Sequence, residues 1–393
     1  MPYETTMGAN SRMNSAERKK SGFSLFNIGV GSIDVTFLIL VLLLLTIGLV
    51  MLFSASFAYA LFYFKDSFHF IKAQLLYAAL GVFLMLLIST VQYRVLDKLS
   101  WPVMAVTIFL LTIVLFFEDR NGAHRWIDLG FTTVQPSEIA KFSVVILFSH
   151  LIIAMGDKMK TFRHGILPFG FILVVIAVLM ILEPHLSGTV LILAIGAIMM
   201  IVGGANLKWF ALAAIIASAG IAVIVMTGAV RYAGSRIDVW LDPFAFPRDE
   251  GFQTIQSLYA IGSGGLMGVG IGNSRQKYLY LPEPHNDFIF SVVCEELGFV
   301  GATLIIILFA LLVWRGFVIA MRCKDRFGSL VAIGLTAQVG LQAILNIMVV
   351  TNTIPNTGIS LPFFSYGGTS LIMLLCQMGV ILSISRETTL EKR

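Results

Sequence analysis

The chain has 393 residues, of which 58% are hydrophobic and 12% are charged, and its formal net charge is +5. A soluble domain carries roughly 25% charged residues, so this composition excludes a soluble enzyme, a disordered tail protein and a nucleic-acid-binding domain. The three cysteines are far apart and have no CxxC spacing, which indicates neither a disulfide framework nor a zinc site. We therefore expect a membrane protein whose positive charge comes from basic cytoplasmic loops.

Ten apolar runs are long enough, at about 20 residues, to cross a bilayer as helices. They cover roughly residues 35–58, 71–91, 99–117, 137–155, 166–183, 188–204, 209–228, 298–320, 328–350 and 368–385. Pro168 and Pro184 shorten the fifth run. The predicted fold class is an all-α polytopic membrane protein with about ten transmembrane helices.

Basic residues predict the orientation of these helices. Lysine and arginine gather near the N-terminus, in alternate loops and at the C-terminus, as in Arg18, Lys158, Arg322 and Arg393. The positive-inside rule then places both termini in the cytoplasm, in agreement with an even number of spans. On this topology, residues 1–33 form a cytoplasmic N-terminal tail and residues 34–393 form the membrane domain.

Residues 229–297 form the long loop between the seventh and eighth spans, and the topology places it on the outer face. This loop holds many carboxylates and several basic residues, but also apolar stretches such as residues 288–293. Those stretches are too hydrophobic for a solvated loop, so we expect parts of it to lie in or on the membrane, packed against the bundle. A long loop between compact elements is more often functional than not.

The fourth span opens with Gln-Pro-Ser-Glu-Ile-Ala-Lys at residues 135–141. Pro136 suits a first helical turn, and Glu138 and Lys141 share a helix face because they are three residues apart. Ionisable groups inside a span usually face a cavity or a partner. Two interpretations follow: an ion pair that neutralises itself at the membrane interface, or a substrate site where Lys141 binds a lipid diphosphate as a point charge.

An aromatic and basic stretch, Asn-Gly-Ala-His-Arg-Trp-Ile at residues 121–127, precedes this span on the outer face. The guanidinium fork of Arg125 matches two phosphate oxygens, which makes it a second candidate for diphosphate binding. Trp126 is typical of the aromatic belt at a membrane interface.

Residues 276–290, in the long loop, contain most of the remaining candidates. Asp287 has polar neighbours on one side and apolar residues on the other, which predicts a raised pKa and a role as general base. As an alternative, Asp287 caps the helix that follows. Glu283, His285 and Asp287 also suggest a metal site, but no fourth ligand is evident and we predict none. Lys277, Glu283 and His285 are further substrate-binding candidates.

Two glycine-containing segments have structural interpretations. The run between Gly262 and Gly272 is not a nucleotide-binding loop, because no strand precedes it and no Lys-Ser/Thr follows in register. We expect it to allow flexibility or close backbone packing. Residues 359–370 combine Pro362 with paired glycines, which indicates either irregular backbone beside a cavity or a tight turn into the tenth span.

Five blocks in this order resemble the SEDS family (shape, elongation, division and sporulation), which contains FtsW, RodA and SpoVE. The resemblance covers nearly the whole chain from about residue 35. The blocks are Asn-Gly-Ala-His-Arg-Trp-Ile at 121–127, Gln-Pro-Ser-Glu at 135–138, Ala-Ile-Gly-Ser-Gly-Gly at 260–265, Leu-Pro-Glu-Pro-His-Asn-Asp-Phe-Ile-Phe at 281–290, and Ser-Tyr-Gly-Gly-Thr-Ser at 365–370.

The resemblance implies ten spans and a peptidoglycan glycosyltransferase in the bacterial cytoplasmic membrane. Its substrate would be lipid II, an undecaprenyl-diphosphate-linked disaccharide pentapeptide, polymerised at the outer face. By position, Asp287 corresponds to the family's essential aspartate, and Arg125, Glu138 and Lys141 to its functional residues. The resemblance also implies a complex with a class B penicillin-binding protein, a transpeptidase, and with other division or elongation proteins.

The chain departs from the family at Glu-Pro-His-Leu-Ser-Gly, residues 183–188, where Gln-Pro-Asp-Leu-Gly-Thr is common. Any role of that aspartate does not transfer. Residues 203–205, 241–243 and 251–253 are most similar to FtsW, which favours division at the septum, while RodA-type elongation and SpoVE-type sporulation remain open.

In the expected mechanism an acceptor hydroxyl attacks the anomeric carbon of lipid II while Asp287 removes its proton. Lys141 and Arg125 hold the leaving diphosphate, with Lys277 or a divalent cation (Mg or Mn) as a further candidate. Forming a β-linkage from an α-linked diphosphate implies inversion. The main rival is a lipid II flippase, which needs polar groups along a path through the bilayer. A scaffold that only recruits other wall proteins is the third possibility.

Overall fold

The computed structural model describes residues 31–117, 125–128, 130, 133–212, 215, 238–248 and 250–389. Most of the predicted N-terminal tail (1–33), the block 121–124 and most of the predicted seventh span (209–228) lie outside these residues.

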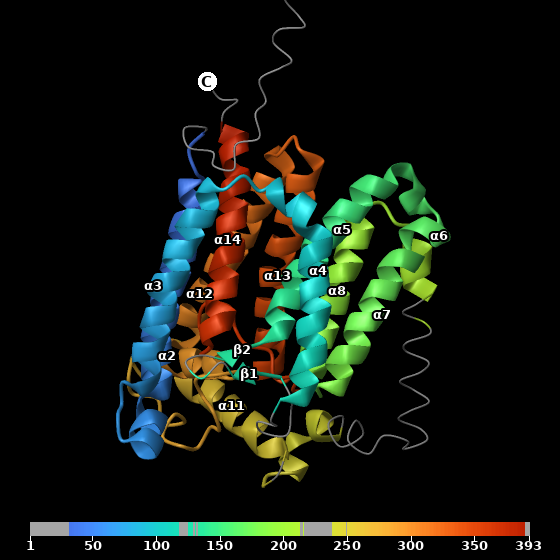
Figure 1. The fold of residues 1–393 in the computed structure, drawn as a ribbon. Helices are drawn as coiled ribbons and strands as arrows, with labels where there is room; N and C mark the ends of the chain where they lie inside the picture. The colour runs from blue at the N-terminus through green and yellow to red at the C-terminus, as the bar shows by residue number, and fades with distance from the viewer. Residues whose placement is uncertain are drawn as a thin grey trace, which may run out of the picture.

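The described chain is a bundle of long apolar helices (Figure 1). Eight helical segments are long and apolar enough to cross a membrane, and the apolar helix α8 (Leu186–Val202) is shorter, at 17 residues. The other bundle helices are α2 (Val35–Phe64), α3 (His69–Thr90), α4 (Val95–Ile113) with η2 (Val114–Phe116), α5 (Pro136–Met155) with η3 (Gly156–Lys160), α6 (Phe162–Gly165), α7 (Leu167–Leu182), α12 (Ile289–Arg322), α13 (Arg326–Val350) and α14 (Gly368–Thr389). The predicted all-α polytopic membrane fold is confirmed.

The start of α2 and the end of α14 lie at the same end of the bundle. Asp34 accepts from the Phe37 N–H as the cap of α2, its own N–H donates to Ser385 Oγ at 3.0 Å, and its carboxylate lies 2.7 Å from Arg315. An even number of crossings places both ends of a bundle on one side. The predicted ten spans satisfy this condition, and the cytoplasmic side of that end stays a prediction.

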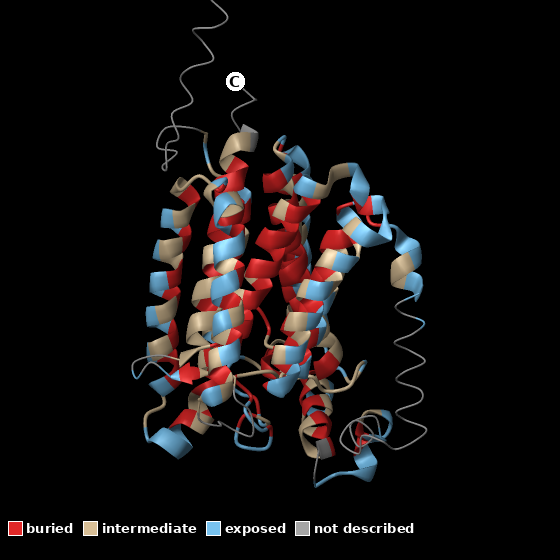
Figure 2. Ribbon diagram, turned by 45° about the vertical axis from the view of Figure 1, so that its right-hand side comes forward, coloured by how far each residue is buried: buried red, intermediate tan, exposed pale blue. Residues whose placement is uncertain are grey.

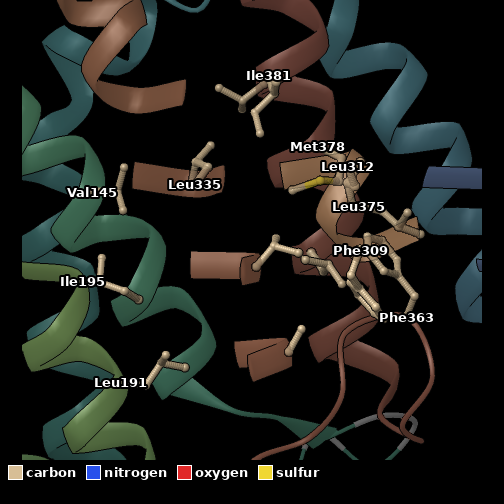
Figure 3. Packing of buried hydrophobic residues seen from close by; sticks show 14 of the residues in the cluster. Val145, Leu191, Ile195, Phe309, Leu312, Leu335, Phe363, Leu375, Met378 and Ile381 are labelled. Carbon is tan, nitrogen blue, oxygen red and sulfur yellow. The ribbon is translucent and has the colours of Figure 1, made fainter. Parts of the chain in front are cut away.

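The outer surface of the bundle is apolar, as lipid contact requires. Phe83, Phe109 and Phe171 are each more than 60% exposed, and exposed positions run along the outer helix faces (Figure 2). The interior is apolar too: side chains from α5, α8, α12, α13 and α14 face one another in Figure 3, among them Val145, Leu335 and Met378. Because lipid tails give no hydrophobic drive for helix association, close packing of this layer is what holds the helices together.

The long loop packs back onto one end of the bundle. It contains η4 (Pro243–Ala245) and the helix α11 (Glu250–Gly264), which contacts α12 and α13 and crosses the lower end of the bundle in Figure 1. The strands β1 (Ile127–Asp128) and β2 (Thr133–Val134) pair antiparallel at the same end. Packing of the loop against the bundle is therefore confirmed.

Helix α12 begins at Ile289, well before residue 298, where the eighth span was predicted to start. The apolar residues 288–293, predicted to lie in or on the membrane as part of the loop, are thus mostly its first turns. The helix is broken at Gly298, whose φ is 66°. Residues 265–270 enter this break, because the N–H groups of Phe299 and Val300 donate to the carbonyls of Gly265 and Leu266. A Cβ on Gly298 would lie 2.2 Å from Gly268 N, so the glycine run serves close backbone packing.

Candidate active site

A cavity of about 430 Å³ opens at the end of the bundle where β1, β2 and α11 lie. Its wall comes from segments far apart in sequence: the β1–β2 region, the start of α5, the start of α8, residues 283–287, and residues 342–370. Five of the seven predicted site residues line it, namely Arg125, Glu138, Lys141, Glu283 and Asp287.

The start of α5 supplies an ion pair to this wall. Pro136 occupies the first helical turn, as predicted, and Lys141 Nζ lies 2.7 Å from Glu138 Oε1. Lys141 also donates to Gln342 Oε1 of α13 at 3.3 Å, and both ionisable residues are buried. The shared helix face is confirmed. The pair both neutralises itself and lines the cavity, so its substrate role stays a prediction.

Asp287 lies just before α12, partly buried at the cavity. The N-cap residue of α12 is Phe288, and no described side chain caps the first turn, so the alternative of a capping aspartate is wrong. A Cβ on Gly358 would lie 3.1 Å from Asp287 Oδ2, which shows how closely that backbone approaches the carboxylate. Burial, together with Glu283, raises the pKa of Asp287 to about 6 against the opposing effect of Arg125. At neutral pH this carboxylate is ionised and basic enough to accept a proton.

The segment that departs from the family pattern also reaches the cavity. Arg125 donates a hydrogen bond to the carbonyl of Pro184, and His185 lines the cavity at the start of α8. Burial, Arg125 and Lys141 lower the pKa of His185 to about 3, so its ring is neutral. Burial raises the pKa of Glu183 to about 8. From the sequence, no site role was predicted for this segment, although ionisable residues on both sides of a proline are a usable signal for a site.

Lys277 is placed away from the cavity, in contrast to the expectation that it holds substrate. It is 2% exposed, and its ammonium lies 2.9 Å from Glu296 Oε1. The same ammonium donates to Ser54 Oγ at 3.0 Å and to the Gly272 carbonyl at 2.6 Å. These contacts use its three donors, so Lys277 holds the long loop to α2 and α12.

His285 does not line the cavity either. Its side chain is buried, and its ring lies 4.3 Å from the ring of Phe70 and 5.0 Å from that of Tyr59. Burial lowers the pKa of His285 to about 4, so the ring is neutral at physiological pH. Its position indicates an aromatic anchor for the 283–287 segment rather than a group that touches substrate.

Polar residues of α13, of the segment before α14 and of the first turn of α14 complete the wall. Gln342, Ser360, Tyr366 and Ser370 line the cavity, and Gln342 Nε2 donates to the Ser360 carbonyl at 3.1 Å. Both alternatives for residues 359–370 are found: the backbone is irregular beside the cavity, and it turns at residues 361–365, where the Ser365 N–H donates to the Leu361 carbonyl, before α14 begins. Gln342 was missed, because it is one of three amides in this span, with Gln338 and Asn346, and an amide in a helix is ambiguous until its partners are known.

In the described part of the chain, no group of three or more His, Cys, Asp or Glu side chains is placed to hold a metal ion. A magnesium or manganese ion at a diphosphate uses mainly substrate oxygens and water, with few protein ligands. Such an ion therefore stays a prediction, and no step below depends on it.

The bundle and its charged end cavity define a polytopic membrane protein with a polar site at one end. The family model for FtsW, RodA and SpoVE, described as "Cell cycle protein", matches residues 34–390. The chain belongs to this family.

Two relatives and two solved structures extend the comparison. Stage V sporulation protein E of Bacillus subtilis (strain 168) is 42% identical over 90% of this chain and 97% of its own. A protein of Geobacter sp. (strain M18) named "Probable peptidoglycan glycosyltransferase FtsW" is 39% identical over 90% of this chain and 96% of its own.

A chain from a structure titled "Structural coordination of polymerization and crosslinking by a peptidoglycan synthase complex" has a TM-score of 0.76 and 29% identity, covering 91% of this chain and 98% of that one. The rod shape determining protein RodA of Thermus thermophilus has a TM-score of 0.65 and 27% identity, covering 90% and 97%.

Proposed function

We propose that this chain is a peptidoglycan glycosyltransferase that polymerises lipid II into glycan strands at the outer face of the bacterial cytoplasmic membrane. The observation that carries this proposal is the placement of Asp287 in one cavity with Lys141 and Arg125. Sugar transfer from a lipid diphosphate needs a base for the acceptor hydroxyl and cationic groups for the leaving group. The family relationship supports the same activity.

In the proposed reaction the acceptor hydroxyl attacks the anomeric carbon of the lipid II donor, and its proton passes to Asp287. The bond from the anomeric carbon to the diphosphate oxygen breaks, and the electron pair leaves with the diphosphate. Lys141 and Arg125 stabilise that charge. The N-termini of α5 and α8, whose Ser137 and Ser187 line the cavity, add favourable dipoles. One base and one stabilised leaving group suffice for inversion.

The interior of the bundle favours this enzyme over a flippase. The layer in Figure 3 includes Val145 and Leu335, which lie about one turn from Lys141 on α5 and two turns from Gln342 on α13, and its side chains are apolar. The buried amides of Gln338 and Gln377 are hydrogen-bonded to each other at 2.9 Å. A diphosphate headgroup needs a polar path through the bilayer, whereas the described charged groups of the cavity lie at one end.

The partner we propose is a class B penicillin-binding protein, which would cross-link the new strands. A peptidoglycan synthase complex among the related structures supports such an assembly. Division at the septum is the proposed cellular role, and the 42% identity to Stage V sporulation protein E supports sporulation as a second candidate. Depletion in cells distinguishes them: loss of a division enzyme gives filaments, whereas loss of a sporulation enzyme spares growth and abolishes spores.

The direct test uses purified protein and lipid II, alone and with the transpeptidase. We expect glycan strands from the wild type and a loss of about 100-fold or more in Asp287→Asn. If neither protein makes strands even with the transpeptidase present, the glycosyltransferase proposal fails and a lipid-translocation assay tests the flippase.

A further inference from the structure

Three successive backbone carbonyls around Asp287 are held by the last third of the chain. The His285 carbonyl accepts from the Tyr366 N–H at 2.9 Å. The Asn286 carbonyl accepts from Ser365 Oγ at 2.8 Å, and the Asp287 carbonyl accepts from Asn346 Nδ2 at 2.7 Å. The segment that carries the proposed base is therefore fixed at three consecutive points, two of them by side chains.

Asn346 has no freedom to make this contact differently. It is fully buried in α13, and its Nδ2 donates to the Ile359 carbonyl at 2.6 Å as well as to the Asp287 carbonyl. The reverse orientation of the amide would aim Oδ1 at two carbonyl oxygens. Burying an amide inside a membrane protein is costly unless it is hydrogen-bonded, and the Oδ1 of Asn346 has no partner among the described residues. The two bonds donated by Nδ2 are therefore the structural task of this side chain.

Ser365 makes the second side-chain contact from the segment before α14. Its hydroxyl donates to Asn286 and accepts from the Leu361 N–H at 2.8 Å. The backbone of residues 361–365 is thereby closed into a turn against the 285–287 segment.

We propose that Asn346 and Ser365 are positioning residues that hold the Asp287 carboxylate at the cavity and hold the Gly358–Ile359 backbone against it. The proposal rests on the proposed role of Asp287 as the base. Neither side chain is required to touch substrate.

The bridge made by Asn346 explains how the carboxylate is kept partly dry. Asn346 Nδ2 donates to the carbonyls of both Asp287 and Ile359. Ile359 directly follows Gly358, and the backbone of Gly358 lies against the Asp287 carboxylate. Loss of the bridge frees both backbones and admits water. Because proximity effects are steep, a displacement of about 1 Å costs on the order of 100-fold in rate.

Admission of water has a consequence for pH. The ionisable groups that line the same cavity are Glu283, Arg125, Glu138, Lys141, His185, Tyr77 and Tyr366. None of them is altered by changing Asn346 to Leu. Burial is the main cause of the raised pKa of Asp287, so solvation lowers that pKa toward its ordinary value.

The test is the pH profile of lipid II polymerisation for Asn346→Leu and Ser365→Ala. Leucine has a volume similar to that of asparagine but has no hydrogen-bond donor. Ser365→Ala removes a single oxygen atom and is the milder variant, which keeps the test valid if Asn346→Leu folds poorly. Gln338→Leu is the matched control, because it removes another buried amide of α13 that bonds Gln377 rather than the 285–287 segment. Thermal unfolding and wild-type activity are measured beside them.

We expect kcat to fall roughly 10- to 100-fold with KM within about threefold, and the acid limb to move about one pH unit lower. Gln338→Leu should keep the wild-type midpoint. The inference is overturned if both variants keep the wild-type midpoint and kcat, or lose activity only in proportion to the folded fraction. If the wild type and Asp287→Asn both make strands, the proposed role of Asp287 as base fails instead. Failure of the positioning inference and failure of the proposed base therefore give different results.

Discussion

The ammonium of Lys141 lies 2.7 Å from the carboxylate of Glu138, one turn earlier on α5, and both side chains line the cavity that contains Asp287. Glu138 therefore fixes the direction of the ammonium before any substrate arrives. Since the pair is almost fully buried, its stability and its proposed substrate role can be separated by mutation.

The first prediction concerns this pair. Glu138→Gln and Lys141→Met should each lower thermal stability, because breaking a buried pair costs about 3–5 kcal/mol by leaving one charge uncompensated. The double variant should regain most of that stability, yet its polymerising activity should stay at least about 100-fold below wild type, since the diphosphate loses a preorganised cation. Unfolding in detergent and strand synthesis from lipid II measure the two effects. Activity restored together with stability would show that the pair only neutralises itself.

The second prediction concerns the buried pair of Lys277 and Glu296. Lys277→Met should destabilise the protein by about 3–5 kcal/mol, because Glu296 remains charged and buried. Adding Glu296→Gln should restore both stability and activity, in contrast to the pair on α5. A Lys277→Met protein that unfolds like the wild type but makes no strands would instead support the substrate role predicted from the sequence.

The third prediction tests the break in α12. Gly298→Ala should destabilise the protein by more than about 1 kcal/mol, because alanine disfavours a φ of 66° and its Cβ would meet the Gly268 backbone. Gly262→Ala is the control, since nothing lies within 4 Å of a Cβ there and its φ is not positive. Equal melting temperatures for the two variants would contradict the described packing of the loop.

The fold follows largely from the sequence because a bilayer leaves the backbone few options. Long apolar runs must be helices, and nine of the ten predicted spans match described helices to within several residues, apart from the earlier start of α12. The seventh, at 209–228, lies mostly outside the described residues. The predicted start of the eighth span at residue 298 coincides with the break in α12, because Glu295 and Glu296 interrupt the apolar sequence just before Gly298. The helical turns from Ile289 to the break were missed for the same reason, since two glutamates separate them from the long apolar run. A positive φ within a helix has no composition signal.

The site was harder to predict than the fold. Arg125, Glu138, Lys141 and Asp287 were identified because charge in or next to an apolar span is conspicuous. Lys277 gave the same signal but is satisfied internally by Glu296, which lies in another segment of the sequence and is recognised only from three-dimensional contacts. Asn346 gave no distinct signal because an amide in a helix is ambiguous until its acceptors are known.

The fourth prediction concerns pH. Polymerisation should fall as the pH drops below about 6, because Asp287 must be ionised to accept a proton and burial raises its pKa to about 6. Between about pH 4, the ordinary carboxyl pKa, and about pH 6, Asp287 keeps its proton in the native protein but has lost it in the unfolded chain. The contribution of Asp287 to stability therefore falls as the pH rises from about 4 to about 6. Asp287→Asn should therefore be at least as stable as the wild type at neutral pH. A lower melting temperature for that variant would contradict the raised pKa.

The central claim is that Asp287 is the base of a lipid II polymerase. The most direct measurement is glycan strand synthesis from lipid II by purified wild type, Asp287→Asn and Asp242→Asn, each shown to be folded and each assayed with the transpeptidase. Asp242 lies in the same loop, where its side chain accepts from the Phe244 N–H at 3.1 Å, and serves as the matched control. We expect strands from the wild type and Asp242→Asn, and a loss of about 100-fold or more in Asp287→Asn. Strands of normal yield from a folded Asp287→Asn protein would contradict it.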